Sequence, residues 1–536
     1  MSNAESDYDV VVVGGGINGA GIARDAALRG LRVLLLEKDD FGSGTTSWSS
    51  RLIHGGLRYL EYAEIPLVFE SLHERRRLRK LAPHLVNRLL LNIPIYKKGR
   101  RSKMIIRLGM IAYDLLSIFK NIPRHKMLSR DELIAEEPGI NREGLLGAAQ
   151  YYDAQVNFAE RLVLENIISA KEAGADVRNY CPAIGINVSH GVVQSVHYLE
   201  QGSAQEMEVS TRMVLNAAGP WVDRVLATVN REIPRFMGGT KGSHIIVSGF
   251  GGAPKSAFYV EAAADGRPFF IIPWNHQYLI GTTDIRYHGD PADVEASEEE
   301  IRYLLDETNR VFPGAKLTVQ DINFTYAGVR PLPLRKKGPE SAITRKHIIK
   351  KHRRVAKGLV SIIGGKLTTY RNLAEQAVDF AVRKLKSDAN ACETRSMPLP
   401  GATGIEEARE DLRELQYLSD SGVARLLGIY GGRASKIARL AADESHLAYT
   451  LDDEESVIAA EVVFALRHEF AVNLTDIVHR RLMTGLSADQ GQGISEEIAE
   501  VAAREMNWNS GEKERQLAEL RQYNARLKSP ISVPQQ

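Results

Sequence analysis

The chain opens with a pattern of apolar and polar positions that predicts a βαβ unit. The run 10–13 is valine at every position, which is typical of a strand buried on both faces. A helical pattern begins after Gly14, and the apolar run 31–37 predicts a second buried strand. Two parallel strands joined by a helix are the building unit of an α/β domain, so we expect the chain to begin with one.

The turn between the first strand and the helix has the spacing of a dinucleotide-binding site. Gly14, Gly16 and Gly19 give G-x-G-x-x-G, with Asn18 in the first helical turn. Such glycines permit a tight turn and let a pyrophosphate approach the helix N-terminus. Glu37 ends the second strand eighteen residues after Gly19, where a carboxylate can accept hydrogen bonds from ribose hydroxyls.

FAD and NAD both bind to such a unit, and the next segment distinguishes between them. An NAD domain continues into another βα repeat, whereas residues 41–62 are polar, rich in glycine and without a strand period. This favours FAD, whose extended flavin half needs hydroxyl donors and bare backbone. We expect six small residues to contact it: Thr45, Thr46, Ser49, Ser50, Gly55 and Gly56. A surface loop rich in Ser and Gly is the alternative.

Two later turns are also expected to reach the cofactor. A predicted strand runs into a small-residue turn and helix at 216–223, which includes Gly219 and Trp221. Segment 359–386 predicts a buried strand, a Gly-Gly turn and an amphipathic helix. A helix N-terminus carries roughly half a positive charge and would stabilise a reduced, anionic flavin. This second turn comprises Gly364, Gly365, Lys366 and Leu367, and Thr368 and Thr369 can cap the helix. An ordinary capped helix is the alternative.

Composition narrows the class of protein. A chain of 536 residues is too long for one core, so two or three packed units are expected. Lys plus Arg (69) nearly equals Asp plus Glu (67), so the overall charge does not favour nucleic acid. Cys181 and Cys392 alone form neither a disulfide framework nor a metal site, which predicts a reducing, cytoplasmic compartment and no metal. We expect neither a signal peptide nor a spanning helix.

Several motifs in order resemble one family. They are VVGGGINGAGIARDAALRGL, SSRLIHGGLRYLE, NAAGPW, KGSHIIV, GTTD, YAGVRPL, AITR and GGKLTTYRNLAE, spread over roughly 8–385. This combination resembles the FAD-dependent, quinone-linked glycerol-3-phosphate dehydrogenases. The resemblance implies an α/β fold: a Rossmann-like FAD-binding domain of the glycine-oxidase and D-amino-acid-oxidase type, an antiparallel-sheet substrate domain and a helical C-terminal domain.

The domains are expected to interleave. Residues 1–396 hold the FAD segments 8–62, 151–223 and 359–386 and the substrate or membrane-facing segments 63–150 and 232–358. A linker rich in proline and glycine near 396–404 then leads to a helical domain at 397–528 and a tail at 529–536.

The resemblance implies oxidation of sn-glycerol 3-phosphate to dihydroxyacetone phosphate by hydride transfer to flavin N5, with a membrane quinone as electron acceptor. An oxidase that uses oxygen, acting on the same ester or on a related 2-hydroxy acid or amino acid, is one alternative. A flavin-binding scaffold or sensor is an alternative of another class. The sequence leaves open whether two copies associate as a homodimer.

Candidate substrate and catalytic residues lie within these motifs. A phosphate monoester needs cations, and arginine offers a planar donor fork. We expect this substrate set: Arg58, Tyr59, Arg330, Arg345 and Lys366. His244 is the expected acceptor of the hydroxyl proton, and His54 is expected to support the flavin. Arg330 or Lys366 could instead stabilise the alkoxide.

A basic and apolar segment, 96–128, is the expected membrane contact. Six cations precede or enter its apolar stretch, which suits an anionic headgroup region at the inner face of the cell membrane. A core helix with a solvated basic cap is equally consistent with the pattern. The second basic run, 345–358, predicts a solvated hairpin loop and leaves a second lipid contact open.

Overall fold

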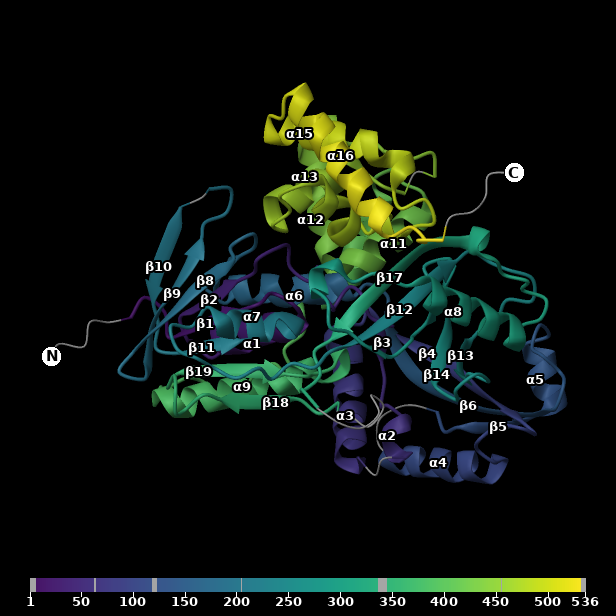
Figure 1. Ribbon diagram of the computed structural model, residues 1–536. Helices are drawn as coiled ribbons and strands as arrows, with labels where there is room; N and C mark the ends of the chain where they lie inside the picture. Colours follow the sequence, from purple (N-terminus) through teal and green to yellow (C-terminus); the bar gives the residue numbers. More distant parts are fainter. Residues whose placement is uncertain are drawn as a thin grey trace.

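The computed structural model describes residues 6–61, 64–117, 123–203, 205–335, 345–454 and 456–531, and it leaves the side chains of Arg58 and Glu61 undescribed. Three bodies are visible in Figure 1: a small sheet with helices near the N-terminus, a larger sheet beside it, and a group of helices above both. The chain passes several times between the first two bodies, and the third is formed by the C-terminal part of the chain.

The smaller sheet is the predicted dinucleotide-binding sheet. Its strand order is β18-β19-β11-β1-β2-β7, parallel except at the β18 edge. The strands are β1 (Val10–Val13), β2 (Val33–Leu36), β7 (Asp176–Arg178), β11 (Val214–Asn216), β18 (Ile348–Lys351) and β19 (Leu359–Ile363). They come from three distant parts of the chain, and five of them lie within the predicted FAD segments, whereas the edge strand β18 lies in the segment 232–358 that was assigned to the substrate side.

Both faces of this sheet are covered, which explains its continuous apolar strands. Val10 and Val12 pack under α1 (Ile17–Leu28), α6 (Ala159–Glu172) and α9 (Tyr370–Leu385). Val11 and Val13 face α7 (Val222–Ala227) and the antiparallel sheet of β8 (Ala183–Ser189), β9 (Val192–Leu199) and β10 (Glu206–Ser210). Successive strand residues point to opposite faces, so the central strands β1 and β2 are apolar at every position.

The larger sheet carries the predicted substrate domain, and it is antiparallel except where β13 pairs with β4. Its strands are β3 (Leu52–Ile53), β4 (Val86–Tyr96), β5 (Lys126–Ser129), β6 (Leu145–Val156), β12 (Thr240–Val247), β13 (Ala257–Glu261), β14 (Pro268–Trp274), β15 (Gln277–Gly281), β16 (Ile285–Arg286) and β17 (Ile322–Arg330). Around it lie the helices α2 (Arg58–Glu61), α3 (Ile65–Leu81), α4 (Lys103–Leu116), α5 (Arg130–Glu136) and α8 (Glu298–Val311).

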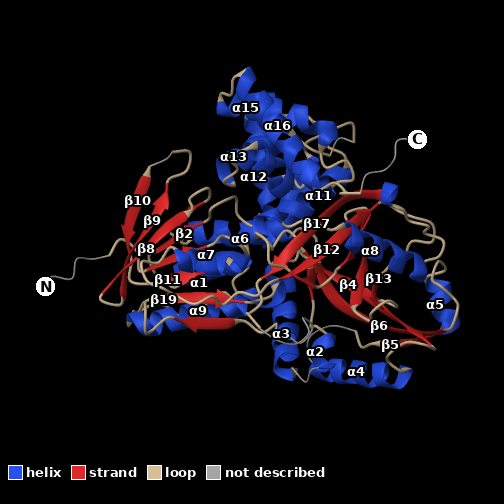
Figure 2. Cartoon of the chain, in the orientation of Figure 1, coloured by secondary structure: helices blue, strands red, loops and turns tan. Residues whose placement is uncertain are grey.

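The C-terminal region is helical, as expected, and lies over both sheets (Figure 2). Its main helices are α10 (Ile405–Arg413), α11 (Asp420–Tyr430), α12 (Ala434–Asp443), α13 (Ala459–His468), α15 (Ser495–Met506) and α16 (Ser510–Arg526). The short α14 (Leu474–Asp476) continues into a π-helical turn, Ile477–Arg481. Within the described ranges, none of the helices of the chain has the length and apolar character needed to cross a bilayer.

The segment 396–404, predicted as a linker, connects α9 to the helical domain and is packed rather than free. Leu399 is buried, and the Gly401 N–H donates to Glu165 of α6 at 2.6 Å. The Arg24 guanidinium of α1 donates to the carbonyls of Met397 and Pro398. Proline and glycine here form turns that are packed against the first domain, so the helical domain is anchored to the small sheet.

Candidate active site

A cavity of about 840 Å³ lies between the two sheets. At one end it is lined by Gly14, Gly16 and Glu37 of the βαβ unit. At the other end it is lined by Tyr59, Arg330 and Lys366. This volume lies within the range of ligand and cofactor pockets, and the cavity reaches every segment that the sequence assigned to the cofactor.

The three glycines of the first turn serve different purposes. Gly14 has a φ of +107°, and a Cβ there would lie 2.8 Å from the Ala217 carbonyl oxygen. A Cβ at Gly19 would lie 1.8 Å from the Gly14 carbonyl oxygen, so Gly19 permits close helix–strand packing. Gly16 is different: it lines the cavity, and a Cβ would meet only the Thr46 hydroxyl, at 3.4 Å. Gly16 therefore keeps open the space where a pyrophosphate approaches α1.

Glu37 is both a cavity residue and a brace for the glycine turn. Its carboxylate accepts from the Gly15 N–H at 2.6 Å and from the Asp39 N–H at 3.0 Å. Burial raises the pKa of the Glu37 carboxyl, while these two hydrogen bonds act in the opposite direction. The carboxylate is thus fixed at the end of β2, where ribose hydroxyls of a dinucleotide are bound in this type of fold.

The hydroxyl residues of the polar loop shape the middle of the cavity. The Thr46 hydroxyl accepts from the Ile17 N–H at the start of α1 (3.2 Å), and the Thr45 hydroxyl donates to the Val329 carbonyl (2.8 Å). Ser49 donates to the Thr46 carbonyl at 3.1 Å. All three line the cavity together with Gly219 and Trp221.

The turn after β19 meets the helix α1 and the segment before α2. The Asn18 amide donates to the Gly364 carbonyl at 3.4 Å, and a Cβ at Gly365 would lie 2.7 Å from that amide nitrogen. Gly365, Lys366 and Leu367 line the cavity, whereas Gly364 and Thr368 stand behind it. The prediction that Thr368 and Thr369 cap α9 is wrong, because neither makes a side-chain cap bond. Instead, the Thr368 hydroxyl accepts from the His54 N–H at 3.1 Å.

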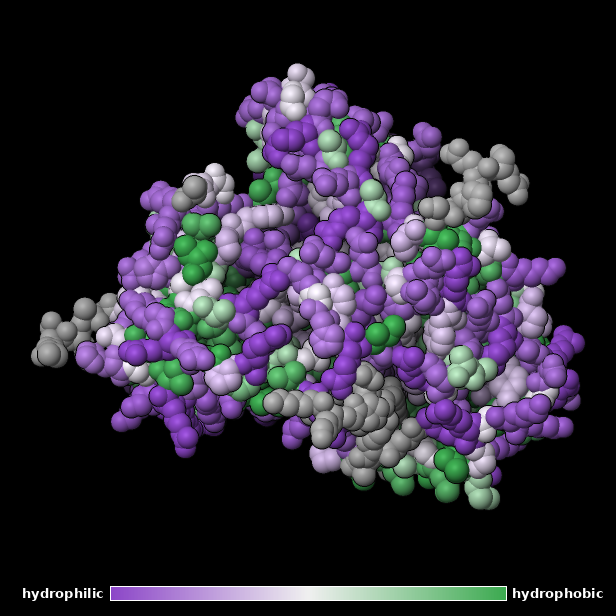
Figure 3. Space-filling model, in the orientation of Figure 1, coloured by the Kyte–Doolittle hydropathy of each residue, from purple (hydrophilic) through white to green (hydrophobic). Residues whose placement is uncertain are grey.

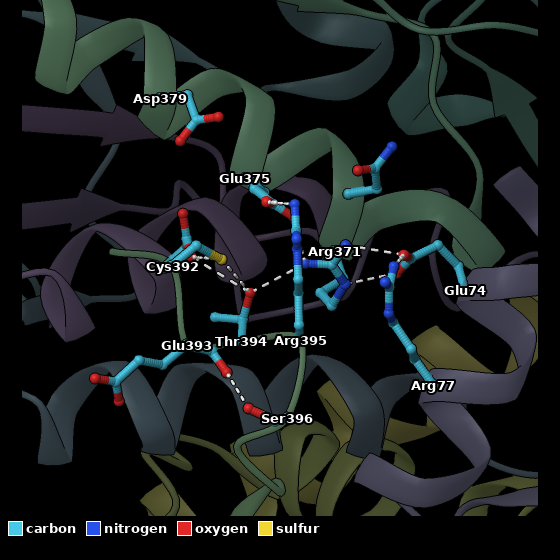
Figure 4. A network of polar contacts seen from close by, with 12 residues as sticks. Glu74, Arg77, Arg371, Glu375, Asp379, Cys392, Glu393, Thr394, Arg395 and Ser396 are labelled. Carbon is cyan, nitrogen blue, oxygen red and sulfur yellow. Dashed lines mark hydrogen bonds and ion pairs between the residues drawn. The ribbon is translucent and has the colours of Figure 1, made fainter. Parts of the chain in front are cut away.

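A buried ion network holds this turn against α3 (Figure 4). Arg371 at the start of α9 donates to both oxygens of Glu74 on α3, at 2.6 and 2.8 Å, and to Glu375 at 2.8 Å. Arg395 and Thr394 close the network around these groups. The helices α3 and α9, which follow the cavity-lining residues Tyr59 and Glu64 and the cavity-lining segment 365–367, are therefore fixed to each other.

The segment 54–56 forms the wall between the two ends. A Cβ at Gly56, whose φ is +74°, would lie 2.1 Å from the Tyr59 ring, so the glycine permits this ring position. Gly55 stands behind the wall, where its N–H donates to Asp153 at 3.1 Å and to the Tyr113 hydroxyl at 3.2 Å. His54 lines the cavity, and burial lowers the pKa of its imidazole to about 4. His54 is therefore neutral near pH 7.

Cations gather at the end of the cavity near Tyr59. The Lys366 ammonium lies 3.7 Å from the centre of the Tyr59 ring and finds no hydrogen-bond acceptor among the described residues. Burial lowers the pKa of Lys366. Arg330 and Arg345 both contact the Asp284 carboxylate, at 3.1 and 3.0 Å. The remaining candidate, Arg58, has a side chain that lies outside the described part of the structure.

Arg330 is held more firmly than the sequence suggested. Its guanidinium donates to the Thr282 hydroxyl and to the Thr283 carbonyl, both at 3.0 Å, besides its contact with Asp284. These groups belong to the GTTD motif, for which the sequence assigned no role. Asp284 is therefore a site residue that was missed, although its position in a quoted motif beside Arg330 was the available signal.

His244 does not lie on the cavity wall, contrary to the expectation for a proton acceptor. Its Nε2 atom lies 2.8 Å from the Ser50 hydroxyl, and Ser50 is the residue that lines the cavity. Burial lowers the pKa of His244 well below its ordinary value. The alternation along β12 turns this side chain toward Tyr326, whose ring centre is 4.8 Å away. Of the two histidines in the motifs, His54 is the one that reaches the cavity.

The described residues do not group three or more His, Cys, Asp or Glu side chains in a way that could hold a metal ion. The fit to FAD, by contrast, rests on an open cradle at Gly16, a helix N-terminus at α1, a fixed carboxylate at Glu37 and a bare backbone at Gly56. This combination defines a flavin-dependent oxidoreductase of the type built on a Rossmann-like unit and an antiparallel sheet.

Comparison with known proteins gives the family. A model of FAD-dependent oxidoreductases matches residues 9–371, and a model of the C-terminal domain of alpha-glycerophosphate oxidase matches residues 392–513. The chain belongs to the glycerol-3-phosphate dehydrogenase family of FAD-dependent oxidoreductases. Its cofactor is FAD.

Individual relatives span nearly the whole chain. A glycerol-3-phosphate dehydrogenase of Synechocystis sp. is 45% identical over 96% of both chains. An aerobic glycerol-3-phosphate dehydrogenase of Staphylococcus haemolyticus is 34% identical over 89% of this chain and 86% of its own. The crystal structure of the Bacillus halodurans glycerol-3-phosphate dehydrogenase complexed with FAD superposes with a TM-score of 0.80 at 26% identity, covering 100% of this chain and 97% of that one. A glycine oxidase of Bacillus cereus shares the fold over 73% of this chain and 98% of its own, with a TM-score of 0.51 at 19% identity.

Proposed function

We propose that this protein oxidises sn-glycerol 3-phosphate to dihydroxyacetone phosphate and passes the electrons to a quinone of the membrane. The observation that supports this substrate is the group of cations at one end of the cavity. Arg330 and Arg345 share one carboxylate, so this pair keeps a net positive charge, and the Lys366 ammonium lies within the same cavity. A phosphate monoester, with close to two negative charges at neutral pH, complements such a group. The names of the relatives support the same substrate.

Bound FAD supplies the hydride acceptor. The protein binds the phosphate through Arg330, Arg345 and Lys366, and their fixed positions orient the glycerol carbons toward the wall at 54–56. We assign proton acceptance from the C2 hydroxyl to His54, because its neutral imidazole faces the cavity. The neighbouring cations favour the alkoxide that forms as the proton leaves.

Attachment to a membrane is supported by the outer face of α4. Met104, Leu108, Ile111 and Leu115 recur every three or four residues and are 73%, 60%, 41% and 62% exposed. This spacing puts them on one side of the helix, and Figure 3 shows hydrophobic residues along the lower edge, where α4 lies. Of the two interpretations of this segment, the outward apolar stripe favours a helix that lies in the headgroup region at the inner face of the cell membrane.

The inner face of α4 touches the wall of the active site. The Tyr113 hydroxyl donates to Asp153 at 2.9 Å and accepts from the Gly55 N–H at 3.2 Å. A helix with one face toward lipid and the other against the segment 54–56 brings the redox centre close to the membrane. This arrangement supports an acceptor dissolved in the bilayer rather than in water.

The membrane proposal is tested with liposomes that contain an anionic lipid. Leu108→Glu and Leu115→Glu together place two charges on the apolar stripe and should prevent co-sedimentation. Lys103→Glu and Arg107→Glu should weaken it in a salt-dependent way, since each cation near an anionic surface contributes about 1 kcal/mol. Arg101 is unsuitable for this purpose, because it already pairs with Glu261. A comparison variant changes two exposed cations of the basic run 345–358, Arg353 and Arg354, and shows whether that run also contacts lipid.

An oxidase is the second candidate, because the C-terminal region matches a model named for alpha-glycerophosphate oxidase. The two functions differ in the electron acceptor. With glycerol 3-phosphate present, a dehydrogenase reduces a quinone analogue and produces little hydrogen peroxide in air. Stoichiometric peroxide with no response to the quinone analogue would replace the quinone proposal by the oxidase.

A further inference from the structure

A buried ion network joins the C-terminal helical domain to the loop that follows β2. Asp40 on this loop is 1% exposed and accepts from Arg481 through both oxygens, at 2.8 Å each. The Arg480 Nε donates to the same carboxylate at 2.5 Å, and its NH2 donates to Asp476 at 2.5 Å. Two arginines and two aspartates thus balance their charges in the interior.

The loop held by this network is one wall of the FAD site. Glu37, Asp39 and Gly42 of the loop line the cavity. Glu37 accepts from the Gly15 N–H, and the Gly42 N–H donates to the Gly15 carbonyl at 3.1 Å. Asp40 lies between these two contacts, so any displacement of Asp40 moves the loop against the glycine turn that cradles the pyrophosphate.

The π-helical turn Ile477–Arg481 allows both Arg480 and Arg481 to reach the Asp40 carboxylate. In an α-helix, consecutive side chains point about 100° apart. Arg480 and Arg481 are consecutive, yet both end on one carboxylate. A wider turn changes where these side chains point, and such turns occur frequently at functional sites.

Tyr180 connects the same network to the loop a second time. Its hydroxyl donates to Asp476 at 2.6 Å, and its backbone N–H donates to the Asp39 carbonyl at 3.0 Å. The loop is therefore held by the C-terminal domain both directly, through Asp40, and through Tyr180.

We propose that Arg480 and Arg481 are positioning residues for the adenosine half of FAD, and that the C-terminal domain completes this part of the cofactor site. They do not line the cavity and act through Asp40 on the loop that carries Glu37. The C-terminal domain would then contribute to cofactor retention, a role beyond the oxidation of the substrate.

A neighbouring group of buried charges, which Arg481 reaches only where its Nε donates to the Glu469 carbonyl at 2.6 Å, provides a matched control. Arg433 of the C-terminal domain contacts Glu165 of α6 at 3.3 Å and Glu469 at 2.5 Å. It is 6% exposed, against 1% for Arg481. Arg433→Gln therefore breaks a comparable contact between the same two domains, but on a helix rather than on the loop beside the cofactor.

The experiment compares FAD release from the holoenzymes of Arg481→Gln and Arg433→Gln, followed by flavin fluorescence well below the melting temperature. We expect Arg481→Gln to release FAD about tenfold faster or more, and Arg433→Gln to lower the melting temperature with release at the wild-type rate. With FAD in excess, the visible spectrum and the rate of flavin reduction of Arg481→Gln should match the wild type, because the flavin end is untouched. Equal release rates in the two variants would overturn the proposal.

If Arg481→Gln does not fold, Tyr180→Phe tests the same idea with all four charges retained. This variant removes the hydroxyl contacts to Asp476 and to Asn473, whose amide donates to the hydroxyl at 2.7 Å, and a release rate a few times faster than wild type is expected. Wild-type release from a folded Tyr180→Phe protein would count against the proposal.

Discussion

Replacing Gly16 by alanine isolates cofactor binding from folding. Gly16 has φ −73° and ψ 179°, which any residue adopts without strain. The added methyl group would meet only the Thr46 hydroxyl, at an ordinary contact distance of 3.4 Å, and otherwise enters the cavity. The protein should therefore fold normally, with a free energy of unfolding in the absence of FAD within about 0.5 kcal/mol of wild type.

The expected loss of FAD affinity follows from the hydrogen bonds at the start of α1. The Ile17 N–H already donates to Thr46, so other N–H groups of the first turn must bind the pyrophosphate. A methyl group in their path lengthens at least one charge-assisted hydrogen bond, which is worth about 1.5–3 kcal/mol. The dissociation constant of FAD should rise about 10- to 150-fold, and Gly16→Val should exceed this effect.

The assay is titration of the apoprotein with FAD, together with thermal unfolding of the same samples. Gly19→Ala serves as the contrasting variant, because its Cβ would lie 1.8 Å from the Gly14 carbonyl oxygen and should destabilise the fold itself. Gly428→Ala is the neutral control: no atom lies within 4 Å of its Cβ, and alanine within helix α11 should stabilise by up to about 1 kcal/mol. A Gly16→Ala protein that binds FAD like the wild type would refute the placement of the pyrophosphate.

Three further predictions concern the substrate end and the response to pH. Arg330→Ala should reduce kcat/KM for glycerol 3-phosphate about 10- to 150-fold, and Arg330→Lys should recover only part of it; unchanged kinetics would remove Arg330 from the phosphate site. His54→Asn should lower kcat far more than His244→Asn, and the reverse order would restore His244 as the proton acceptor. Acidification from pH 6.5 to about 4 should lower stability, by about 1.4 kcal/mol for each unit of pKa shift, because the unfolded chain binds protons that buried neutral histidines in the folded state do not. Burial lowers the pKa of His84 and of His352 to about 4, and that of His479 to about 3. Urea unfolding at several pH values checks this prediction, and a constant free energy of unfolding over that range would contradict it.

The cofactor half of the site was predictable because local sequence determines it. A run of apolar residues, three spaced glycines and a terminal acid specify a strand, a turn and a helix without knowledge of distant residues. Gly14, Gly16 and Glu37 accordingly lie where the pattern placed them. The same holds for the turn at Gly365 and Lys366, whose glycines adopt positive φ.

Features that depend on tertiary packing were not predictable. Strand alternation shows that His244 and the residues on either side of it point to opposite faces of the sheet. It does not show which face lies against the cavity. In the structure Ser50 lies on the cavity wall, and His244 contacts Ser50 from behind. Proline and glycine near 396–404 indicate turns equally well in a free linker and in a buried connection. Helix α16 lies within the predicted helical domain, but it is so rich in charged residues that its apolar face is weak and its bounds could not be predicted. Asp40 and Arg481 lie 441 positions apart, so no local pattern joins them.

The most direct test of the central claim is to mix the FAD-loaded protein with glycerol 3-phosphate in the absence of oxygen and to follow the visible absorbance of the flavin. If the cavity binds this ester beside the cofactor, as proposed, the yellow absorbance bleaches, and dihydroxyacetone phosphate forms in an amount equal to the flavin reduced. Glycerol, which lacks the phosphate, should bleach it far more slowly at the same concentration. A fully loaded protein that stays yellow with glycerol 3-phosphate would contradict the proposed activity and favour a flavin-binding scaffold.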